Sequence, residues 1–253
     1  LEEHVDRFLF SAGQTYMKVP FPRETIRDAL MELARINSVT SGLAKFFAYY
    51  PDIEFGTTPS GGVSVAVFCF NYSSCGIRKP GENDSVSVGI SPYRKLHPQT
   101  TTVHAKVVGN YVNGYLARME SRSRGFDEAL MLDTGGFIAE GPSANIFLIR
   151  GETVETPTEE NVLPGITRKV ILEVLDDMGY PEKQVHIRPG DLQRYEEAFF
   201  SGTTNPVLPI RCIERKDFIC PGPLTREVRR KIEEVLKGAV PRYEKYLTRI
   251  PRD

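Results

Sequence analysis

The chain has 253 residues, 40% of them hydrophobic, and its 32 basic and 33 acidic residues leave a formal net charge of -1. Both signs are interspersed, without a basic stripe or an acidic tail, which argues against nucleic acid or an anionic membrane as the main partner. No apolar run approaches the length of a membrane span, and the four cysteines have neither zinc-ligand spacing nor the density of a disulfide scaffold, so we expect a cytoplasmic protein that binds small molecules.

The first 72 residues are expected to form a small α/β domain. Between Pro22 and Asn37 apolar residues recur at helical spacing, which predicts an amphipathic helix. The segments Leu43–Tyr50 and Val63–Phe70 are rich in aromatic and β-branched residues and predict two strands. Residues 73–84 collect Asn, Ser, Gly, Pro and charge with little periodicity, so we place the connection between two domains there.

Residues 85–253 are expected to form a larger, β-rich domain with flanking helices. An alternating apolar pattern predicts a first strand at Ser85–Ile90. Two hairpins are predicted next, and their strands flank short turns: Glu128–Leu132 and Gly136–Ala139 around Thr134-Gly135, then Asn145–Ile149 and Glu152–Thr156 around Arg150-Gly151. Helical periodicity predicts two amphipathic helices, Arg168–Met178 and Thr225–Leu236. The first of them ends before Gly179, a residue suited to the left-handed conformation that often follows a helix.

A lysine and a tyrosine stand five residues apart in the run Ala105-Lys106-Val107-Val108-Gly109-Asn110-Tyr111. A lysine amine that has lost its proton can form an imine with a carbonyl cofactor such as pyridoxal phosphate. The alternative for Lys106 is a solvated surface charge, as for most lysines of a soluble chain. Lys106 is therefore a candidate catalytic residue only in combination with motifs elsewhere in the chain.

Two later segments have the composition of phosphate-binding turns. In Leu163-Pro164-Gly165-Ile166-Thr167-Arg168, a Pro-Gly turn comes directly before a predicted helix, whose first N–H groups and dipole attract an anion. The alternative there is plain helix capping with Thr167 as the N-cap. Ser201-Gly202-Thr203-Thr204-Asn205-Pro206 follows a strand predicted at Ala198–Phe200 and offers hydroxyls and free amides, although alone it is also consistent with an ordinary polar loop.

Glu140 lies after a predicted strand in Ala139-Glu140-Gly141-Pro142-Ser143-Ala144-Asn145. A carboxylate aimed inward there could hold a pyridine nitrogen protonated. Protonation makes the ring of pyridoxal phosphate a better electron acceptor. The alternative for a lone glutamate is a solvated surface position.

Taken in order, these motifs resemble those of class IV (fold type IV) pyridoxal-phosphate aminotransferases, and most of all branched-chain amino acid aminotransferases. The resemblance extends from Leu1 to about Arg211. The motifs that carry it are His4-Val5-Asp6-Arg7, Lys106-x-x-x-Asn110-Tyr111, Glu140-Gly141-x-x-x-Asn145, Leu163-Pro164-Gly165-Ile166-Thr167-Arg168, and Ser201-Gly202-Thr203 followed by Pro209.

The resemblance implies an α+β fold, with a small N-terminal α/β sandwich domain and a larger C-terminal β-rich pseudo-barrel domain with flanking helices. It also implies a homodimer. The family normally begins with a few strands that have no counterpart before the first helix here. Leu1 is not a methionine, so we expect one of two cases: the given chain omits a segment before it, or the protein is a truncated relative with a more open site.

The resemblance also implies roles for single residues. Lys106 would form the Schiff base with pyridoxal 5'-phosphate and shuttle a proton, Tyr111 would bind the phenolic oxygen, and Glu140 would pair with the pyridinium nitrogen. The phosphate would be held by Arg7, the amides of Ile166 and Thr167, and the Thr203 hydroxyl. Thr204 and Asn205 would receive the substrate carboxylate. No metal is expected.

One departure from the family affects the substrate site. Branched-chain enzymes usually have Tyr-x-Arg-Pro where this chain has Leu43-Ala44-Lys45-Phe46, so Lys45 replaces a residue that binds substrate or shapes its pocket. We expect an aminotransferase that acts on an aliphatic amino acid and a 2-oxo acid such as 2-oxoglutarate. The alternatives are a D-amino acid aminotransferase, an aminodeoxychorismate lyase, and a catalytically silent binding protein that retains the fold.

Overall fold

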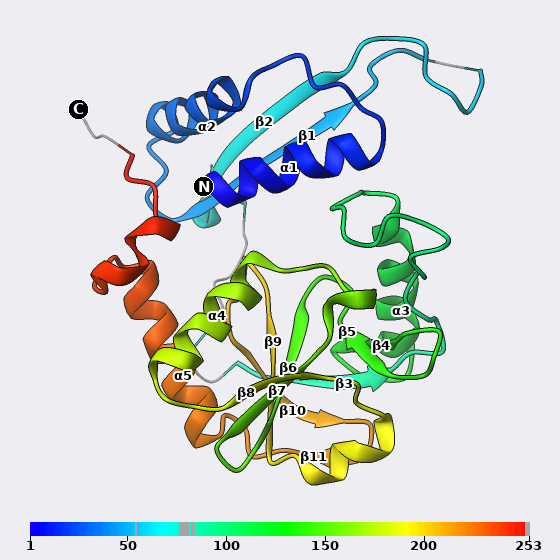
Figure 1. Cartoon of the computed structure of the whole chain (residues 1–253), viewed down its shortest axis with the longest axis vertical. Coiled ribbons are helices and arrows are strands. Elements are labelled where there is room, and N and C mark those ends of the chain that lie inside the picture. Colours follow the sequence, from blue (N-terminus) through cyan, green and yellow to red (C-terminus); the bar gives the residue numbers. More distant parts are fainter. Residues whose placement is uncertain (54, 76–80, 82–83, 251–253) are drawn as a thin grey trace. The chain divides into compact units, whose positions relative to one another are not determined.

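The computed structural model describes residues 1–53, 55–75, 81 and 84–250 (Figure 1). The chain divides into two compact units, Leu1–Lys79 with Pro241–Asp253, and Pro80–Val240. The described residues 241–250 thus group with the first unit, whereas the prediction from the sequence places them in the second domain. The connection predicted at 73–84 lies partly outside the described residues, at 76–80, 82 and 83.

The first unit has two helices and a two-stranded antiparallel sheet. The elements are α1 (Glu2–Gln14), α2 (Arg23–Ile36), β1 (Gly42–Tyr49) and β2 (Ser64–Asn71), with short 3-10 helices at Tyr72–Cys75 and Pro241–Tyr246. Val5, Ile26 and Leu30 form its core, against which Phe46 and Val67 of the sheet pack. Because side chains alternate along a strand, Lys45 projects from the opposite face of the sheet.

The second unit contains a nine-stranded sheet in the part of the chain that the structure describes. Its strands are β3 (Val86–Ile90), β4 (Glu128–Leu132), β5 (Ile138–Glu140), β6 (Asn145–Arg150), β7 (Thr153–Pro157), β8 (Glu182–Val185), β9 (Glu197–Ser201), β10 (Leu208–Ile213) and β11 (Lys216–Asp217). Pairing runs from β10 through β3, β4, β5, β6 and β9 back to β10. These strands therefore close into a barrel.

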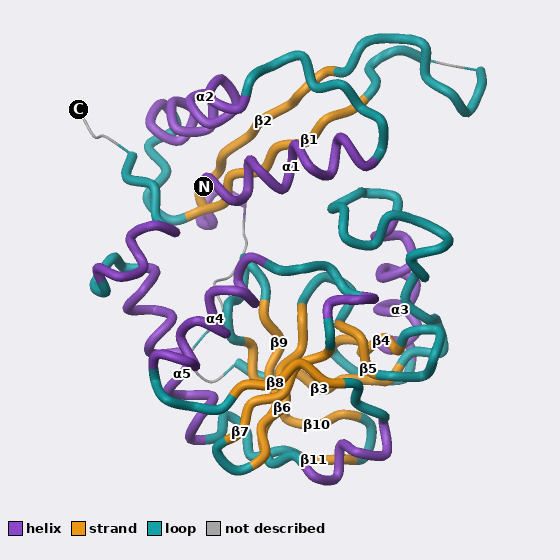
Figure 2. Tube along the Cα trace, in the orientation of Figure 1, coloured by secondary structure: helices purple, strands orange, loops and turns teal. Residues whose placement is uncertain are grey.

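The barrel interior is apolar, and its strands contribute to one hydrophobic cluster. Members of this cluster are Val88, Leu130, Ile138, Ile146, Phe200 and Ile210. Three helices lie outside the strands (Figure 2): α3 (Asn110–Ser123) packs on β4, α4 (Ile166–Asp177) on α5, and α5 (Pro223–Leu236) on α4 and β9. Further 3-10 helices span Glu159–Asn161 and Pro189–Arg194. The predicted β-rich pseudo-barrel is confirmed.

Most of the elements predicted from periodicity are confirmed, with ends that shift by no more than two residues. Gly179 has the expected left-handed conformation, with φ +77. The alternative interpretation with Thr167 as an N-cap is wrong, because Gly165 is the N-cap of α4 and Thr167 lies within its first turn. The sequence reasoning also missed α3.

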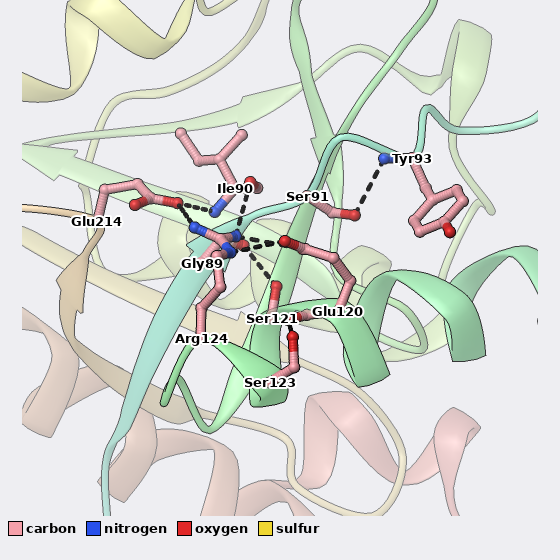
Figure 3. Close-up of polar contacts among 9 residues, drawn as sticks. All are labelled: Gly89, Ile90, Ser91, Tyr93, Glu120, Ser121, Ser123, Arg124 and Glu214. Atoms are coloured by element: carbon pink, nitrogen blue, oxygen red, sulfur yellow. Dashed lines mark hydrogen bonds and ion pairs between the residues drawn. The ribbon is translucent and has the colours of Figure 1, made fainter.

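A polar network fixes the end of α3 (Figure 3). Arg124 donates to the Glu214 carboxylate at 2.9 Å and to the Ile90 carbonyl oxygen at 3.0 Å. The backbone N–H of Ile90 donates to the same Glu214 oxygen at 2.6 Å. Ser121 adds a bond from its hydroxyl to the Gly89 carbonyl oxygen. The network joins α3 to the end of β3 and to the turn between β10 and β11.

Candidate active site

Three polar residues lie in a row across the barrel. Glu140, the last residue of β5, pairs with Asn145 at the start of β6, and Asn145 pairs with Ser201 at the end of β9. Directly paired residues of neighbouring strands project from the same face of a sheet. Since the adjacent residues Ile146 and Phe200 belong to the barrel core, the row faces outward.

Glu140 reaches this face through an irregular register. Met131 of β4 pairs with Glu140, but the next residue, Leu132, pairs with Ile138, so one step along β4 corresponds to two along β5. In a regular strand Glu140 would share a face with Ile138, which lies in the core. The bulge at Ala139 instead turns the carboxylate outward, and bulges often re-aim side chains at functional sites.

The Glu140 carboxylate is buried, with 5% of the residue exposed, and it is surrounded by donors. Asn145 donates its side-chain N–H to one oxygen at 2.9 Å. The other oxygen accepts the backbone N–H of Leu163 at 3.4 Å and forms an ion pair with Lys95 at 2.5 Å. Burial raises the pKa of the Glu140 carboxyl, while Lys95 and the Leu163 N–H act in the opposite direction.

The start of α4 lies against this row. Asn145 also donates to the Leu163 carbonyl oxygen at 3.0 Å, which ties the row to the turn before the helix. A Cβ on Gly165 would lie 2.1 Å from the Asn145 side-chain oxygen, so only glycine fits at this N-cap. The N–H groups of Ile166 and Thr167 belong to the first helical turn, which has no intrahelical acceptors. Such a turn attracts anions.

The turn after β9 brings hydroxyl groups to the same end of the barrel. The N–H of Gly202 donates to the Asn205 carbonyl oxygen at 3.1 Å, which closes the turn. Thr203 and Thr204 are exposed within it. Among the described residues, the buried hydroxyl of Ser201 has no hydrogen-bond partner. A buried hydroxyl without a protein partner is uncommon and is free to bind a water molecule or a polar ligand.

Lys106 lies in a loop just before α3, and its Nζ donates to the Tyr111 hydroxyl at 2.5 Å. The loop is closed by Asn110, which accepts from the Thr101 hydroxyl at 3.0 Å and donates to the Thr102 carbonyl oxygen at 3.1 Å. The predicted Lys106 and Tyr111 pair is therefore in direct contact. Lys106 also contributes to the electrostatic environment of Glu140.

Helix α3 packs closely on the turn that follows Glu140. A Cβ on Gly114 would lie 2.8 Å from the Pro142 carbonyl oxygen, and Arg118 donates to the Ser143 hydroxyl at 3.0 Å. Tyr111 lies one turn before Gly114 on the same helix. The second unit thus brings the lysine and tyrosine, the buried carboxylate and the start of α4 into one region.

Two predicted site residues belong to the first unit. Arg7 lies on α1, half-buried, with Nη2 at 3.5 Å from the Nδ1 of His4. Lys45 is exposed on β1, where it pairs with Phe68. Their roles toward the phosphate and the substrate stay predictions.

Sequence reasoning missed two residues of this region. Lys95 lies between predicted elements, where no periodicity or motif marks it. Asn145 is the last residue of the Glu140-Gly141-x-x-x-Asn145 motif, but no function was predicted for it from the sequence. Its hydrogen bonds to Glu140 and to the Leu163 carbonyl oxygen link Glu140 to the turn before α4. A strand-end asparagine five residues after the acid was the available signal.

The described part of the chain contains neither a membrane-spanning helix nor a cluster of metal-binding side chains. In residues 1–53, 55–75, 81 and 84–250, no helix is long and apolar enough to cross a membrane. Within the same ranges, no group of three or more His, Cys, Asp or Glu residues is arranged to hold a metal ion.

The fold is that of a class IV aminotransferase. A family model described as amino-transferase class IV matches residues 1–213, and the chain belongs to this family. Among curated proteins, a branched-chain-amino-acid aminotransferase of Pseudomonas aeruginosa is 29% identical over 251 residues, which cover 98% of this chain and 81% of that protein.

Solved structures of branched-chain aminotransferases are also similar. One from the archaeon Thermoproteus uzoniensis, with norvaline, has a TM-score of 0.92 and 30% identity, covering 99% of this chain and 84% of that one. Another, from Thermobaculum terrenum in the PLP form, has a TM-score of 0.91 and 25% identity, covering 99% of this chain and 82% of that one. The predicted fold class is therefore confirmed.

Proposed function

We propose that the chain is a pyridoxal-phosphate-dependent aminotransferase that moves an amino group from an aliphatic, branched-chain-like amino acid to a 2-oxo acid such as 2-oxoglutarate. The observation that carries the proposal is the buried Glu140 carboxylate, held in one unit with the Lys106 and Tyr111 pair. Family membership and the branched-chain names of similar proteins support it.

The donor set of the second unit fits pyridoxal phosphate. Glu140 supplies a buried acid for the ring nitrogen, and Tyr111 a hydroxyl for the phenolic oxygen. The first turn of α4 offers N–H groups suited to a phosphate, and Gly165 lets the Asn145 side chain approach this turn closely. The Ser201 hydroxyl adds a buried polar atom without a described partner on the same barrel face.

The chemistry divides between the cofactor and the protein. When bound, pyridoxal phosphate supplies an aldehyde carbon that binds amines and a ring that accepts electrons from the α carbon of the substrate. Lys106 would hold the resting cofactor covalently and then, as a free amine, move the proton at the α carbon. Tyr111 would orient the Lys106 amine through the contact between their polar atoms. Glu140 would hold a proton on the ring nitrogen.

The phosphate and the substrate would be held by backbone and side-chain donors. We assign the phosphate to the amides of Ile166 and Thr167, the Thr203 hydroxyl and the Arg7 guanidinium, which suits phosphate geometry. Supporting this assignment, Thr203 is exposed in the turn after β9. The substrate carboxylate is assigned to two residues of the same turn, Thr204 and Asn205. Lys45 is assigned to substrate binding or to the shape of the substrate pocket.

A coupled assay tests the proposed function. The cofactor-loaded protein is given 2-oxoglutarate with L-leucine or with D-alanine, and glutamate formation is measured. We expect glutamate from L-leucine. Glutamate from D-alanine alone would move the assignment to D-amino acid transfer. Pyruvate released from aminodeoxychorismate without an amino acceptor would establish a lyase, and no turnover in any arm would indicate a silent binding protein.

We also infer that the protein is a homodimer, as family membership implies, and that it is cytoplasmic, as its cysteine content suggests. An apolar stripe on α3 supports the dimer, because large apolar surface patches mark interaction sites. Its members recur at helical spacing and are exposed by 41 to 76%: Val108, Val112, Tyr115, Leu116 and Met119. These residues lie on and just before the helix that carries Tyr111.

Replacing Val112 and Leu116 together by aspartate is expected to convert a dimer to a monomer, since burying two unpaired charges in an apolar contact costs several kcal/mol. Light scattering coupled to size-exclusion chromatography measures the mass directly. Ile219→Asp, at another exposed apolar residue, is the matched control and should leave the mass unchanged. An unchanged dimer in the α3 double variant would exclude this stripe as the interface.

A further inference from the structure

Lys95 makes a shielded ion pair with Glu140. Its Nζ lies 2.5 Å from Oε1 of the carboxylate, and the exposed fractions of the two side chains are 17% for Lys95 and 6% for Glu140. Pairs of exposed charges contribute little to stability, but a pair withdrawn from water interacts strongly. The Lys95 and Glu140 pair belongs to the second kind.

The backbone around Lys95 is fixed against β4. The N–H of Ser91 donates to the Leu130 carbonyl oxygen at 2.9 Å, and the N–H of Lys95 donates to the Leu132 carbonyl oxygen at 2.8 Å. Between these anchors, the Tyr93 N–H donates to the Ser91 hydroxyl at 3.1 Å (Figure 3). The segment therefore runs along β4, the strand that pairs with β5 and Glu140. Lys95 is placed by several backbone contacts.

The buried carboxylate needs a nearby cation to stay ionised. Burial favours the protonated acid and raises the pKa of the Glu140 carboxyl, while Lys95 contributes the largest opposing effect. Lys106 also lowers this pKa, and Arg168 of α4 interacts with Glu140 electrostatically. Asn145 and the Leu163 N–H are neutral donors. Among the described residues, Lys95 is the cation that contacts the carboxylate directly.

We propose that Lys95 is a positioning residue of the cofactor site, which keeps Glu140 ionised and oriented for the ring nitrogen of pyridoxal phosphate. This inference rests on the proposed function. Lys95 need not touch the cofactor, because it acts through the Glu140 carboxylate. Its effect resembles that of an outer residue that orients a ligand-binding side chain.

The charge on Lys95 favours a protonated ring nitrogen. Two cations that contact one carboxylate repel each other and lie farther from each other than from the carboxylate. The attraction between Lys95 and the Glu140 anion therefore exceeds its repulsion from a pyridinium. With Lys95 removed, the proton shared by Glu140 and the ring would move toward the carboxylate.

The test compares cofactor bound to wild-type protein and to Lys95→Met. Pyridoxal phosphate labelled with 15N at the ring is added, and the nitrogen chemical shift is followed by NMR as a function of pH. We expect the ring nitrogen of Lys95→Met to carry less of the proton that it shares with Glu140, so that its chemical shift lies closer to that of a neutral pyridine than in the wild type at the same pH. The dissociation constant of pyridoxal phosphate should rise about tenfold or more, as for a lost contact to a charged group.

Three further variants make the test specific. Lys95→Arg keeps the charge and should restore the wild-type titration. Lys183→Met removes an exposed lysine of β8 and should change nothing. In a Glu140→Gln background, Lys95→Met should have no further effect on the ring nitrogen, because its route of action is gone. Circular dichroism shows whether each variant is folded.

Two results would overturn the inference. A Lys95→Met titration equal to that of the wild type would make Lys95 a structural residue only. Tighter cofactor binding with a more strongly protonated ring would make Lys95 a competitor of the cofactor for Glu140. If wild-type protein bound no pyridoxal phosphate, the proposed function itself would fail, and this inference with it.

Discussion

Replacing Lys106 by alanine is expected to lower kcat by at least roughly 10²–10⁴-fold, the range that proton transfer by a positioned side chain contributes. The loss of covalent attachment to the cofactor adds to this effect. The fold should be unaffected, because Lys106 is exposed in a loop that Asn110 closes without it. The kcat of each protein is measured from the turnover of L-leucine with 2-oxoglutarate, with cofactor in excess.

Two further variants separate the amine from the charge. Lys106→Arg keeps a cation near Tyr111 but cannot form an imine or act as a base at neutral pH, so it should be as inactive as the alanine variant. Lys237→Ala, at a lysine side chain that is 75% exposed on the surface, should match the wild type. Substantial turnover in Lys106→Ala would remove Lys106 from the chemistry.

Glu140→Gln is expected to lower kcat by roughly 10 to 150-fold. The amide keeps the shape of the side chain, but it cannot accept a charge-assisted hydrogen bond from a pyridinium, and such a bond is worth about 1.5–3 kcal/mol. The change also leaves the Lys95 ammonium without its buried counter-ion. Steady-state kinetics at saturating cofactor give kcat, because the saturating concentration prevents loss of cofactor from lowering the measured rate.

The matched control for Glu140 is Glu155→Gln. Glu155 is also buried, at 7% exposure. Its carboxylate accepts hydrogen bonds from the Arg150 guanidinium of β6 and from the Tyr195 hydroxyl. It has no part in the proposed site, so its variant should lose stability but keep kcat. Equal losses of kcat in both variants would mean that Glu140 acts only through folding.

The secondary structure was predictable where periodicity is local. The strands of the two hairpins and helices α2, α4 and α5 each show their apolar spacing within one segment. Helix α3 was missed although Val112, Tyr115, Leu116 and Met119 recur at helical spacing. Its Gly114 lowers helix propensity, and the reason for this glycine, its close approach to Pro142, is a tertiary contact that the sequence does not show.

The site was predictable in its motifs and not in its geometry. Lys106 and Tyr111 are five residues apart, and the turn before α4 is a single short segment, so each motif is visible locally in the sequence. The outward aim of Glu140 depends on a bulge at Ala139, which is set by the pairing of β5 with β4. Lys95 reaches Glu140 from 45 positions earlier in the chain, through backbone bonds to β4. Register and long-range contacts of this kind require the structure.

The central claim is that Lys106 is the lysine that binds pyridoxal phosphate. Borohydride reduction of the cofactor-loaded protein fixes the cofactor to its lysine, and mass spectrometry of a proteolytic digest locates it. We predict that the added mass lies on the peptide containing Lys106, and that amino donor added before reduction lowers its amount. Cofactor fixed to Lys95 or to another lysine, or to none, would contradict the account.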